Sequence, residues 1–293
     1  MKLSMLLPVY NEELLLLNSL TTTLPYIDEA VIINGSPWGP STDKTKEIIF
    51  SLEPPLLEKV KYLEGAFVND DGSWDESAQR NLGLSKVTGD FLMPHCADMI
   101  YSESDIREMR YAIERFPEKK IFYCLFIEFF CDTNHIRLYR DAHHFASWYP
   151  VPVVGDIPIL SMQLNPYYEN GPQLRINQDF LNGSDFVYVH NAIRYHYGWV
   201  KPFKTQVEKH VRNVKLKQWG EHGQSLLEKG EKAIYAWAIS HVLEYDSMDC
   251  KYVFTGKQPD VLKNRFFSYL EGHAEALKEY EIIFGEQFWM ESY

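Results

Sequence analysis

Long hydrophobic runs and an excess of positive charge are both missing from this chain of 293 residues. No run approaches the ~18 apolar residues of a membrane-spanning helix, and the apolar segment near the start is too short for a secretory signal. We therefore expect a cytoplasmic protein whose contact with membranes is at most peripheral. Lys and Arg total 29 against 41 Asp and Glu, for a formal net charge of -12. Tight binding to nucleic acid is not expected at this charge.

Cysteine is scarce, and no two cysteines have C-x-x-C spacing, which speaks against a zinc site or a disulfide framework. The four cysteines are Cys96, Cys124, Cys131 and Cys250. A glycine-rich phosphate loop after the first predicted strand is also absent, and this disfavours a nucleotidyltransferase. The 45% content of hydrophobic residues is nevertheless ample for a sizeable core. The composition is therefore compatible with a folded enzyme.

The amino-terminal half predicts strands that alternate with helices. Residues 3–9 read as a buried parallel strand, and residues 12–23 as the helix that follows it, with Asn11 as its cap. A second strand covers residues 30–33. This order predicts a parallel sheet that binds ligands at the carboxyl ends of its strands. The other predicted elements are a helix over residues 44–52 and strands over residues 60–64, 121–130 and 135–140.

From Pro202 onward the pattern becomes helical. The predicted helices cover residues 203–219, 225–244 and 259–284. We therefore predict an α/β domain over residues 1–201 and a helical carboxyl-terminal extension over residues 202–293.

The most informative stretch runs from Trp74 to Asp98. It predicts a helix that bears Arg80, a turn at Gly89-Asp90 and a short apolar strand that leads to Asp98. A carboxylate at the end of a buried strand can hold Mg²⁺ or Mn²⁺ against a diphosphate, because these cations prefer hard oxygen ligands. A guanidinium binds phosphate oxygens with two parallel hydrogen bonds. The stretch therefore predicts nucleotide-sugar chemistry.

These motifs, in this order, resemble those of family 2 glycosyltransferases of the GT-A fold. Residues 7–13 contain the P-V-Y-N-E turn, residues 79–86 resemble the R-N-x-G-L helix, and residues 88–90 read T-G-D. Where the family has D-A-D, this chain has Cys96-Ala97-Asp98. A subgroup reads Q-A-D there and has a later H-Y-G-W-V segment, which is similar to residues 196–200. The resemblance covers roughly residues 1–215.

The resemblance implies an α/β protein of the GT-A (Rossmann-like) fold, with a mixed, mainly parallel sheet flanked by helices. It implies inverting transfer of a sugar from a UDP- or GDP-linked donor to a glycan or other hydroxyl acceptor, assisted by Mn²⁺ or Mg²⁺. The metal ligands would be Asp98 and His196. The residues implied in binding the nucleotide sugar are Pro8, Tyr10, Asn11, Glu12, Asn34, Arg80, Ala97 and Asp98.

Inverting transfer requires a carboxylate within hydrogen-bond reach of the acceptor hydroxyl. Asp156 is the first candidate, because Gly155-Asp156 follows the predicted strand at 135–140 as in the family's R-x-x-R and G-D arrangement. Asp185 and Asp179 are the alternatives, since either could precede the strand that contains His196.

A second interpretation is a GT-A scaffold that binds a nucleotide or glycan without turnover. Cys96 favours it, because it removes the first acidic ligand of the family motif. Gln258 also favours it, because the subgroup has a histidine in the corresponding F-x-G-x-H-P turn.

Overall fold

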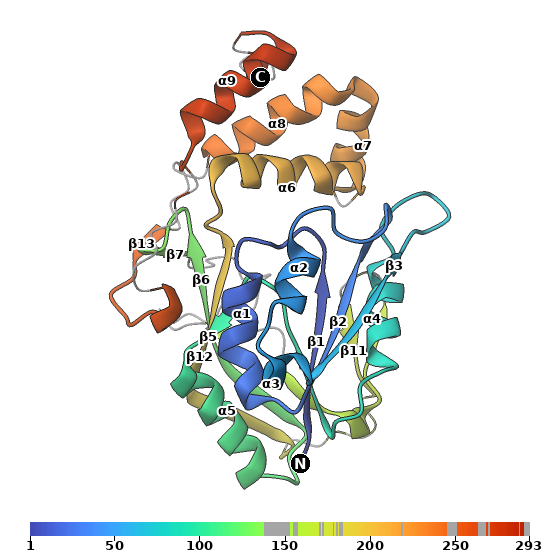
Figure 1. Ribbon diagram of the computed structural model, residues 1–293, viewed down its shortest axis with the longest axis vertical. Helices are drawn as coiled ribbons and strands as arrows, with labels where there is room; N and C mark the ends of the chain where they lie inside the picture. The colour runs from blue at the N-terminus through green and yellow to red at the C-terminus, as the bar shows by residue number, and fades with distance from the viewer. Residues whose placement is uncertain are drawn as a thin grey trace. The chain divides into compact units, whose positions relative to one another are not determined.

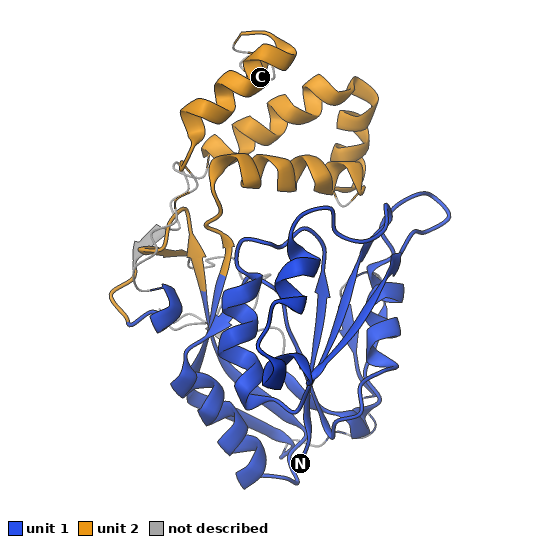
Figure 2. Cartoon of the chain, in the orientation of Figure 1, with its two compact units in different colours: residues 1–127, 145–196, 257–263 blue, residues 128–144, 197–256, 264–293 orange. Residues whose placement is uncertain are grey.

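The computed structural model describes most of the chain, and the described residues form two compact units (Figure 2). The first unit takes its described residues from 1–127, 145–196 and 257–263, and the second from 128–144, 197–256 and 264–293. The predicted boundary at residue 202 lies near residue 197, where the second unit takes over, but each unit also includes segments from elsewhere. The described residues are 1–137, 153–154, 158–169, 171, 173–177, 179, 181, 184–217, 219–244, 251–262, 268, 270–286 and 288–289.

Four parallel strands form one half of the sheet of the first unit, in the order β4-β1-β2-β3 (Figure 1). The register sets Val9 of β1 beside Asn34 of β2 and Leu6 of β1 beside Pro94 of β4. The carboxyl ends of β1, β2 and β4 therefore meet at one edge of the sheet. The strands are β1 (Leu3–Val9), β2 (Glu29–Ser36), β3 (Val60–Ala66) and β4 (Phe91–Pro94).

Antiparallel strands continue the sheet beyond β4. Strand β9 (Ile159–Ser161) pairs with β4, and β6 (Ile121–Phe130) pairs with β9. Strand β12 (Phe186–Trp199) pairs with β6 and with the short β5 (Met99–Tyr101). The sheet is thus mixed, with its parallel strands flanked by helices, which confirms the predicted fold class.

Shorter strands complete the described structure. Strand β8 (Val153–Val154) pairs with β6, and β10 (Tyr167–Glu169) and β11 (Gln173–Arg175) form a separate two-stranded sheet. Strands β7 (His135–Arg137) and β13 (Lys251–Val253) are antiparallel partners in the second unit. The predicted strand at 135–140 is present as far as residue 137, and residues 138–140 lie outside the described residues.

Helices cover both faces of the parallel strands because β1 and β2 are apolar on both faces. Leu3, Met5 and Leu7 pack with residues of α1 (Leu16–Thr23) and α5 (Glu103–Arg115). Leu6, Val31 and Ile33 pack on the other face, toward α4 (Glu76–Leu84). The remaining helical segments of the first unit are α2 (Thr45–Phe50), α3 (Pro54–Leu57), η1 (Leu24–Tyr26), η2 (Met162–Leu164) and η5 (Asp260–Leu262).

Helix α4 lies against the sheet at Gly83, and we expect Gly83→Val to destabilise the fold. A Cβ at this position would overlap Ile33 and lie 2.6 Å from Cδ1 of Leu6, both of which are buried. Overpacking of a filled core costs about 1–3 kcal/mol, so we expect a loss of about 3 kcal/mol in the free energy of unfolding by urea titration. Leu82→Val, at an exposed position of the same helix, is the control and should cost less than about 1 kcal/mol. Equal stability of the two variants would contradict the close contact.

The second unit is mainly helical, and the bounds of its helices differ from those we predicted. The predicted helix over 225–244 is wrong: α7 (Gly220–Lys229) and α8 (Glu231–Leu243) are separated by Gly230, whose φ of 89° breaks the helical path. The predicted helix over 259–284 is also wrong, since α9 (His273–Phe284) starts after Gly272, with a φ of 69°. The predicted helix over 203–219 is present as α6 (Phe203–Lys215), which starts where we predicted and ends at Lys215.

Asn11 does not cap the first helix, contrary to our prediction. Helix α1 begins only at Leu16, and Asn11 has a left-handed backbone with a φ of 54°. The hydrogen bonds of Asn11 with the loop before α2, which are described below, explain this backbone conformation.

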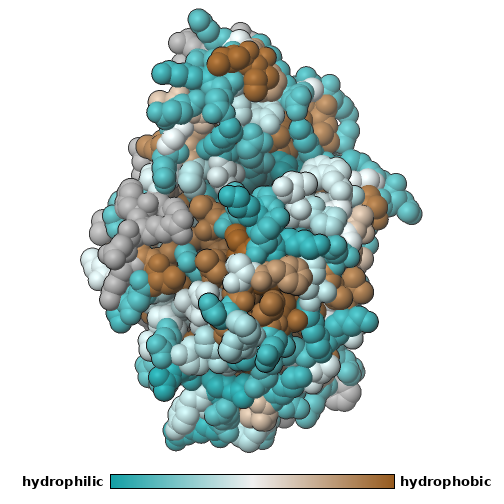
Figure 3. All heavy atoms as spheres, viewed as in Figure 1, coloured by the Kyte–Doolittle hydropathy of each residue, from teal (hydrophilic) through white to brown (hydrophobic). Residues whose placement is uncertain are grey.

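No helix in the described part of the chain has both the length and the apolar content needed to cross a membrane. The face of the molecule in Figure 3 is largely hydrophilic, with apolar side chains gathered in separate patches. Among the described cysteines, Cys96, Cys124 and Cys131 are free thiols.

Candidate active site

The candidate site is built at the carboxyl ends of β1, β2 and β4. Strand β1 leads to Tyr10, Asn11 and Glu12, β2 ends near Asn34, and β4 leads to residues 95–98. The backbone N–H of His95 donates to the carbonyl of Leu6 at 3.0 Å, which extends the β1–β4 ladder toward Asp98. Sheet topology alone therefore brings these three segments to one edge.

Asp98 and His196 meet because β5 follows Asp98 directly and pairs with β12. The antiparallel register aligns His196 with Met99, Tyr195 with Ile100 and Arg194 with Tyr101. As a result, Nε2 of His196 lies 3.4 Å from Oδ1 of Asp98. Asp98 is 8% exposed, so its carboxylate lies at the border between the core and the surface. The structure thus brings the two predicted metal ligands together.

Arg80 lies on α4, which a buried glutamine fixes to the end of β2. The side chain of Gln79 is 1% exposed and donates to the carbonyls of Ile33 and Gly35 at 3.0 and 3.1 Å. Arg80 lies over the ring of Tyr168, with its Cζ 5.4 Å from the ring centroid, and its NH2 is 3.6 Å from Glu76. Among the described residues, the buried Nε of Arg80 has no hydrogen-bond partner. The side chain as a whole is 15% exposed, so part of its cationic group is open to an anion.

The predicted charged residues Asp98, Arg80 and Glu12 all lie around the thiol of Cys96. Burial, and then the charge of Asp98, raise the pKa of Cys96 to about 11, while Arg80 and Arg194 oppose that shift and Glu12 adds to it. Asp98, Arg80 and Glu12 are therefore all within electrostatic reach of one sulfur atom. Because its pKa is high, Cys96 is a neutral thiol near pH 7 when no metal ion is bound.

The turn after β1 is held by the loop that precedes α2. The backbone N–H of Asn11 donates to Ser41 at 2.9 Å, and the side chain of Asn11 accepts from the N–H of Thr42 at 2.9 Å. The N–H of Glu12 donates to Thr45 at 2.8 Å. These bonds compensate for the left-handed backbone of Asn11. The two loops therefore form one hydrogen-bonded unit at the site.

Asn34 is placed beside this unit but is fully buried, with an exposed fraction of 0%. Its Oδ1 accepts from the N–H and the hydroxyl of Ser41 at 2.9 and 2.6 Å, and its Nδ2 donates to Tyr62 at 2.8 Å. The amide is thus engaged with protein groups, and its observed contacts hold the loop at residue 41.

The other predicted nucleotide-binding residues are close to these groups in the chain and largely buried. Tyr10 is 7% exposed and packs against Trp38 and Trp74, with ring centroids 6.3 and 5.9 Å apart. Pro8 lies within β1 opposite Ile33, and Ala97 is 4% exposed beside Asp98.

Sequence reasoning missed two buried groups behind Asp98. His95 is 1% exposed, and its Nε2 is 2.8 Å from the hydroxyl of Ser19; burial lowers the pKa of His95 to about 3, so the ring is neutral. Arg194 is 2% exposed and its Cζ lies 5.5 Å from the ring centroid of Phe126. Arg194 could have been found from the sequence, because it lies two residues before His196 on one strand and the two side chains therefore share a face.

Among the predicted general bases, Asp185 does not lie at this edge of the sheet. Asp185 lies beside the amino-terminal end of β6, where its carbonyl accepts from the N–H of Ile121 at 3.0 Å and its carboxylate is 3.2 Å from Nζ of Lys120. Asp98, in contrast, follows the carboxyl end of β4. Asp179 is exposed, and Asp156 lies outside the described residues.

The residues present fit a divalent cation that is shared with a diphosphate. Within the described ranges, no three His, Cys, Asp or Glu side chains form a metal-binding group. Cations at nucleotide sites commonly take only one or two carboxylates from the protein, and phosphates and water complete the coordination. Asp98 and His196 offer one carboxylate and one imidazole, a donor set that suits Mn²⁺ better than Mg²⁺.

The fold and the site together define an α/β protein of the GT-A class, in which parallel strands deliver charged side chains to their carboxyl ends. The model of the family named glycosyl transferase family 2 matches residues 4–196, and the chain belongs to this family. The chain is therefore a glycosyltransferase.

Several solved structures are similar to the chain at low sequence identity. Residues 1–349 of TarS from S. aureus are 15% identical, with 85% of this chain and 73% of that chain covered and a TM-score of 0.45. Glucosyl-3-phosphoglycerate synthase from Mycobacterium tuberculosis, in complex with Mn²⁺, UDP and phosphoglyceric acid, is 13% identical, with 74% and 78% covered and a TM-score of 0.42. No curated protein matches the chain.

Proposed function

We propose that the protein transfers a sugar from a UDP- or GDP-linked donor to a hydroxyl of a glycan or other acceptor, with inversion at the anomeric carbon. The observation that carries the proposal is the meeting of Asp98 and His196, 3.4 Å apart, at the sheet edge where Arg80 is also in electrostatic reach. A carboxylate, an imidazole and a guanidinium at the carboxyl ends of parallel strands suit a pyrophosphate.

The nucleotide would bind across the turn at residues 10–12. Arg80 would donate to the diphosphate from its guanidinium, since its side chain is partly exposed at this edge of the sheet. Pro8, Tyr10, Asn11 and Glu12 would shape the base and ribose side. Asn34 would act on the base indirectly, by holding the loop at Ser41, and Ala97 would allow close approach beside Asp98.

Asp98 and His196 would hold Mn²⁺ or Mg²⁺, and the cation would supply charge stabilisation for the leaving diphosphate. Arg80 contributes in the same sense, because its positive charge offsets negative charge that develops on the phosphate oxygens. The neutral Cys96 thiol adds no negative charge at the position where the family motif has its first carboxylate.

On the acceptor side, a carboxylate would take the proton of the hydroxyl while its oxygen forms the new bond to the anomeric carbon. The bond from that carbon to the diphosphate breaks in the same step, and its electron pair leaves with the diphosphate. Asp156 is our first choice for the base. Asp185 is the weaker choice because its carboxylate is paired with Lys120, beside the amino-terminal end of β6 and away from the carboxyl end of β4.

Nucleotide binding tests the proposal directly. We expect UDP or GDP to bind in isothermal titration calorimetry, and Arg80→Gln to weaken that binding about tenfold, because a charge-assisted hydrogen bond contributes roughly 1.5–3 kcal/mol. Arg107→Gln is the matched control, since Arg107 is 66% exposed on α5. Failure of both nucleotides to bind, with and without Mn²⁺, would contradict the proposal.

A second candidate, a scaffold that binds the nucleotide sugar without turnover, is favoured by the neutral thiol at position 96. Slow hydrolysis of the bound donor distinguishes the two. An enzyme releases free sugar from UDP- or GDP-sugars in the presence of Mn²⁺, whereas a scaffold binds the same compounds and releases none.

A further inference from the structure

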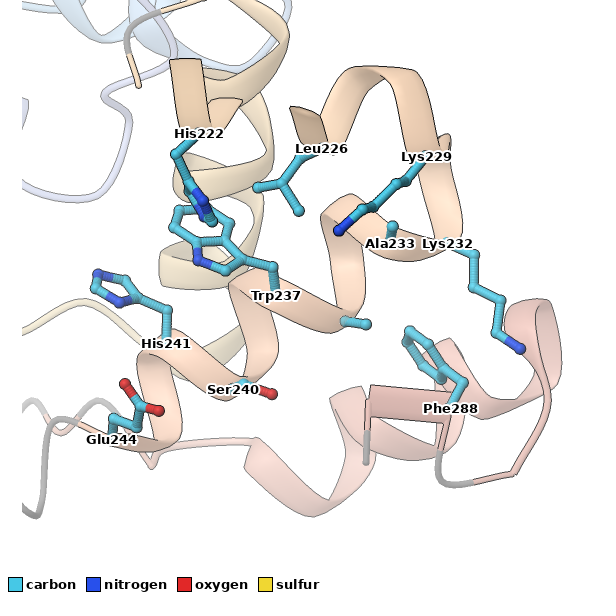
Figure 4. A pocket seen from close by; sticks show the side chains of 11 residues that line it. His222, Leu226, Lys229, Lys232, Ala233, Trp237, Ser240, His241, Glu244 and Phe288 are labelled. Atoms are coloured by element: carbon cyan, nitrogen blue, oxygen red, sulfur yellow. The ribbon is translucent and has the colours of Figure 1, made fainter. Parts of the chain in front are cut away.

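The helical unit contains a pocket of its own, with a volume of about 440 Å³ (Figure 4). We call it the helical pocket. It lies between α7, α8 and the turn at Phe288, and its volume is in the usual range for small-molecule sites. Its lining residues include small, aromatic and charged side chains, and all of them belong to the second unit.

The pocket exists because one face of α8 is made of small residues. Ala233, Ala236 and Ser240 lie three and four positions apart, so they share a face, and none of them fills the space above it. Trp237 on the same helix provides an aromatic wall. Its ring stacks on His241 with centroids 5.2 Å apart, and His222 of α7 meets it edge-on at 5.5 Å.

The two ends of the helical pocket differ in charge. Lys229 and Lys232 line one end, and Figure 4 shows the Lys229 ammonium directed into the space between Trp237 and Phe288. Among the described residues Lys229 is in no ion pair, and the neighbouring Glu231 is paired with Lys215 at 2.8 Å. Ser240, His241 and Glu244 lie at the other end (Figure 4).

We propose that the helical pocket binds a phosphorylated sugar or polyol unit. The ammonium group of Lys229 binds the phosphate, the apolar face of the sugar packs against Trp237 and Phe288, and the far end binds hydroxyls. This chain has a net charge of -12, so a cationic end is a local exception that selects an anion. The inference is independent of the transfer reaction proposed above.

The hydroxyl-binding end favours a sugar over a nucleobase. A carboxylate and a serine hydroxyl can serve several hydroxyl groups at once, and burial lowers the pKa of His241, so its neutral ring can both donate and accept. One face of Trp237 is already covered by His241, with an interplanar angle of 12°, which leaves no slot in which a base is stacked on both sides.

Calorimetry with the full chain tests the assignment, using glucose 6-phosphate as the probe. We expect glucose 6-phosphate to bind more tightly than glucose or inorganic phosphate, and Lys229→Gln to bind it about tenfold more weakly. Lys278→Gln, at an exposed position of α9, is the matched control. Ala233→Leu, which fills the space without changing charge, should also remove binding.

Each other outcome overturns the proposal. Absence of glucose 6-phosphate binding, or binding that the lysine and Ala233 variants leave unchanged, would exclude this site. UDP binding that is lost in Lys229→Gln would assign the pocket to nucleotides instead. Arg80→Gln should leave glucose 6-phosphate binding intact, so failure here and failure of the proposed donor site are distinguishable.

Discussion

Asp98→Asn should reduce sugar transfer and donor hydrolysis by about 10²- to 10³-fold, the loss typical when a group that stabilises charge in the transition state is removed. Asn has nearly the same shape as Asp, but it removes the negative charge that faces His196 at 3.4 Å. The measurement is the release of nucleotide from a UDP- or GDP-sugar at saturating Mn²⁺. We also expect Mn²⁺ to lose its effect on nucleotide affinity in this variant.

Asp70→Asn is the control for the charge change, because Asp70 is exposed in the loop between β3 and α4. Its activity should equal that of the wild type. If Asp98→Asn retained most of the transfer activity and the same response to Mn²⁺, Asp98 would not be the metal-binding carboxylate.

Glu29→Gln should lower the free energy of unfolding by about 2–4 kcal/mol, because it leaves buried donors facing an amide in place of a carboxylate. Glu29 is 3% exposed. Its carboxylate is 2.7 Å from Lys61, 3.0 Å from Lys2, and accepts from the N–H and hydroxyl of Thr88 at 2.8 and 2.6 Å. Chemical denaturation at pH 7 measures the loss, and Glu279→Gln, in an exposed pair with Lys204, should cost less than about 1 kcal/mol.

The same carboxylate makes stability depend on pH. Burial alone would raise the pKa of Glu29, but the hydrogen bonds from Lys61 and Thr88 outweigh it and hold the pKa well below the ordinary 4.5. Its contribution is complete above pH 4.5 and is lost as the pH falls toward the folded-state pKa, because the unfolded chain binds the proton first. The difference between wild type and Glu29→Gln should therefore shrink below pH 4.5, and a constant difference would contradict this account.

Local patterns in the sequence predicted the parallel half of the sheet well. A short run of apolar residues such as Leu3–Val9 predicts a strand that is buried on both faces, and the structure has this strand. The loop bonds were not predictable in the same way. Asn11 and Asn34 owe their conformations to Ser41 and Thr42, in a loop whose path the sequence pattern does not specify.

Other features could not be predicted from the sequence because they depend on contacts between residues that are far apart in the chain. Asp185 was considered as a base because it precedes the strand of His196, yet its neighbours are Lys120 and Ile121, which only the folded ladder reveals. Helix periodicity continued across Gly230, but its backbone conformation separates α7 from α8. The helical pocket depends on that separation, because residues of both helices line it.

The ladder between β5 and β12 has a consequence for how this protein can vary. Three aligned residue pairs set His196 opposite the start of β5, although long stretches of chain separate the partners. Insertions or deletions between β5 and β12 can accumulate without disturbing the two donor atoms. A single extra residue within the paired stretch would instead present a tyrosine to Asp98, since adjacent side chains on a strand point to opposite faces. Evolution is thus free to remodel the intervening loops while it keeps the length of this short ladder constant.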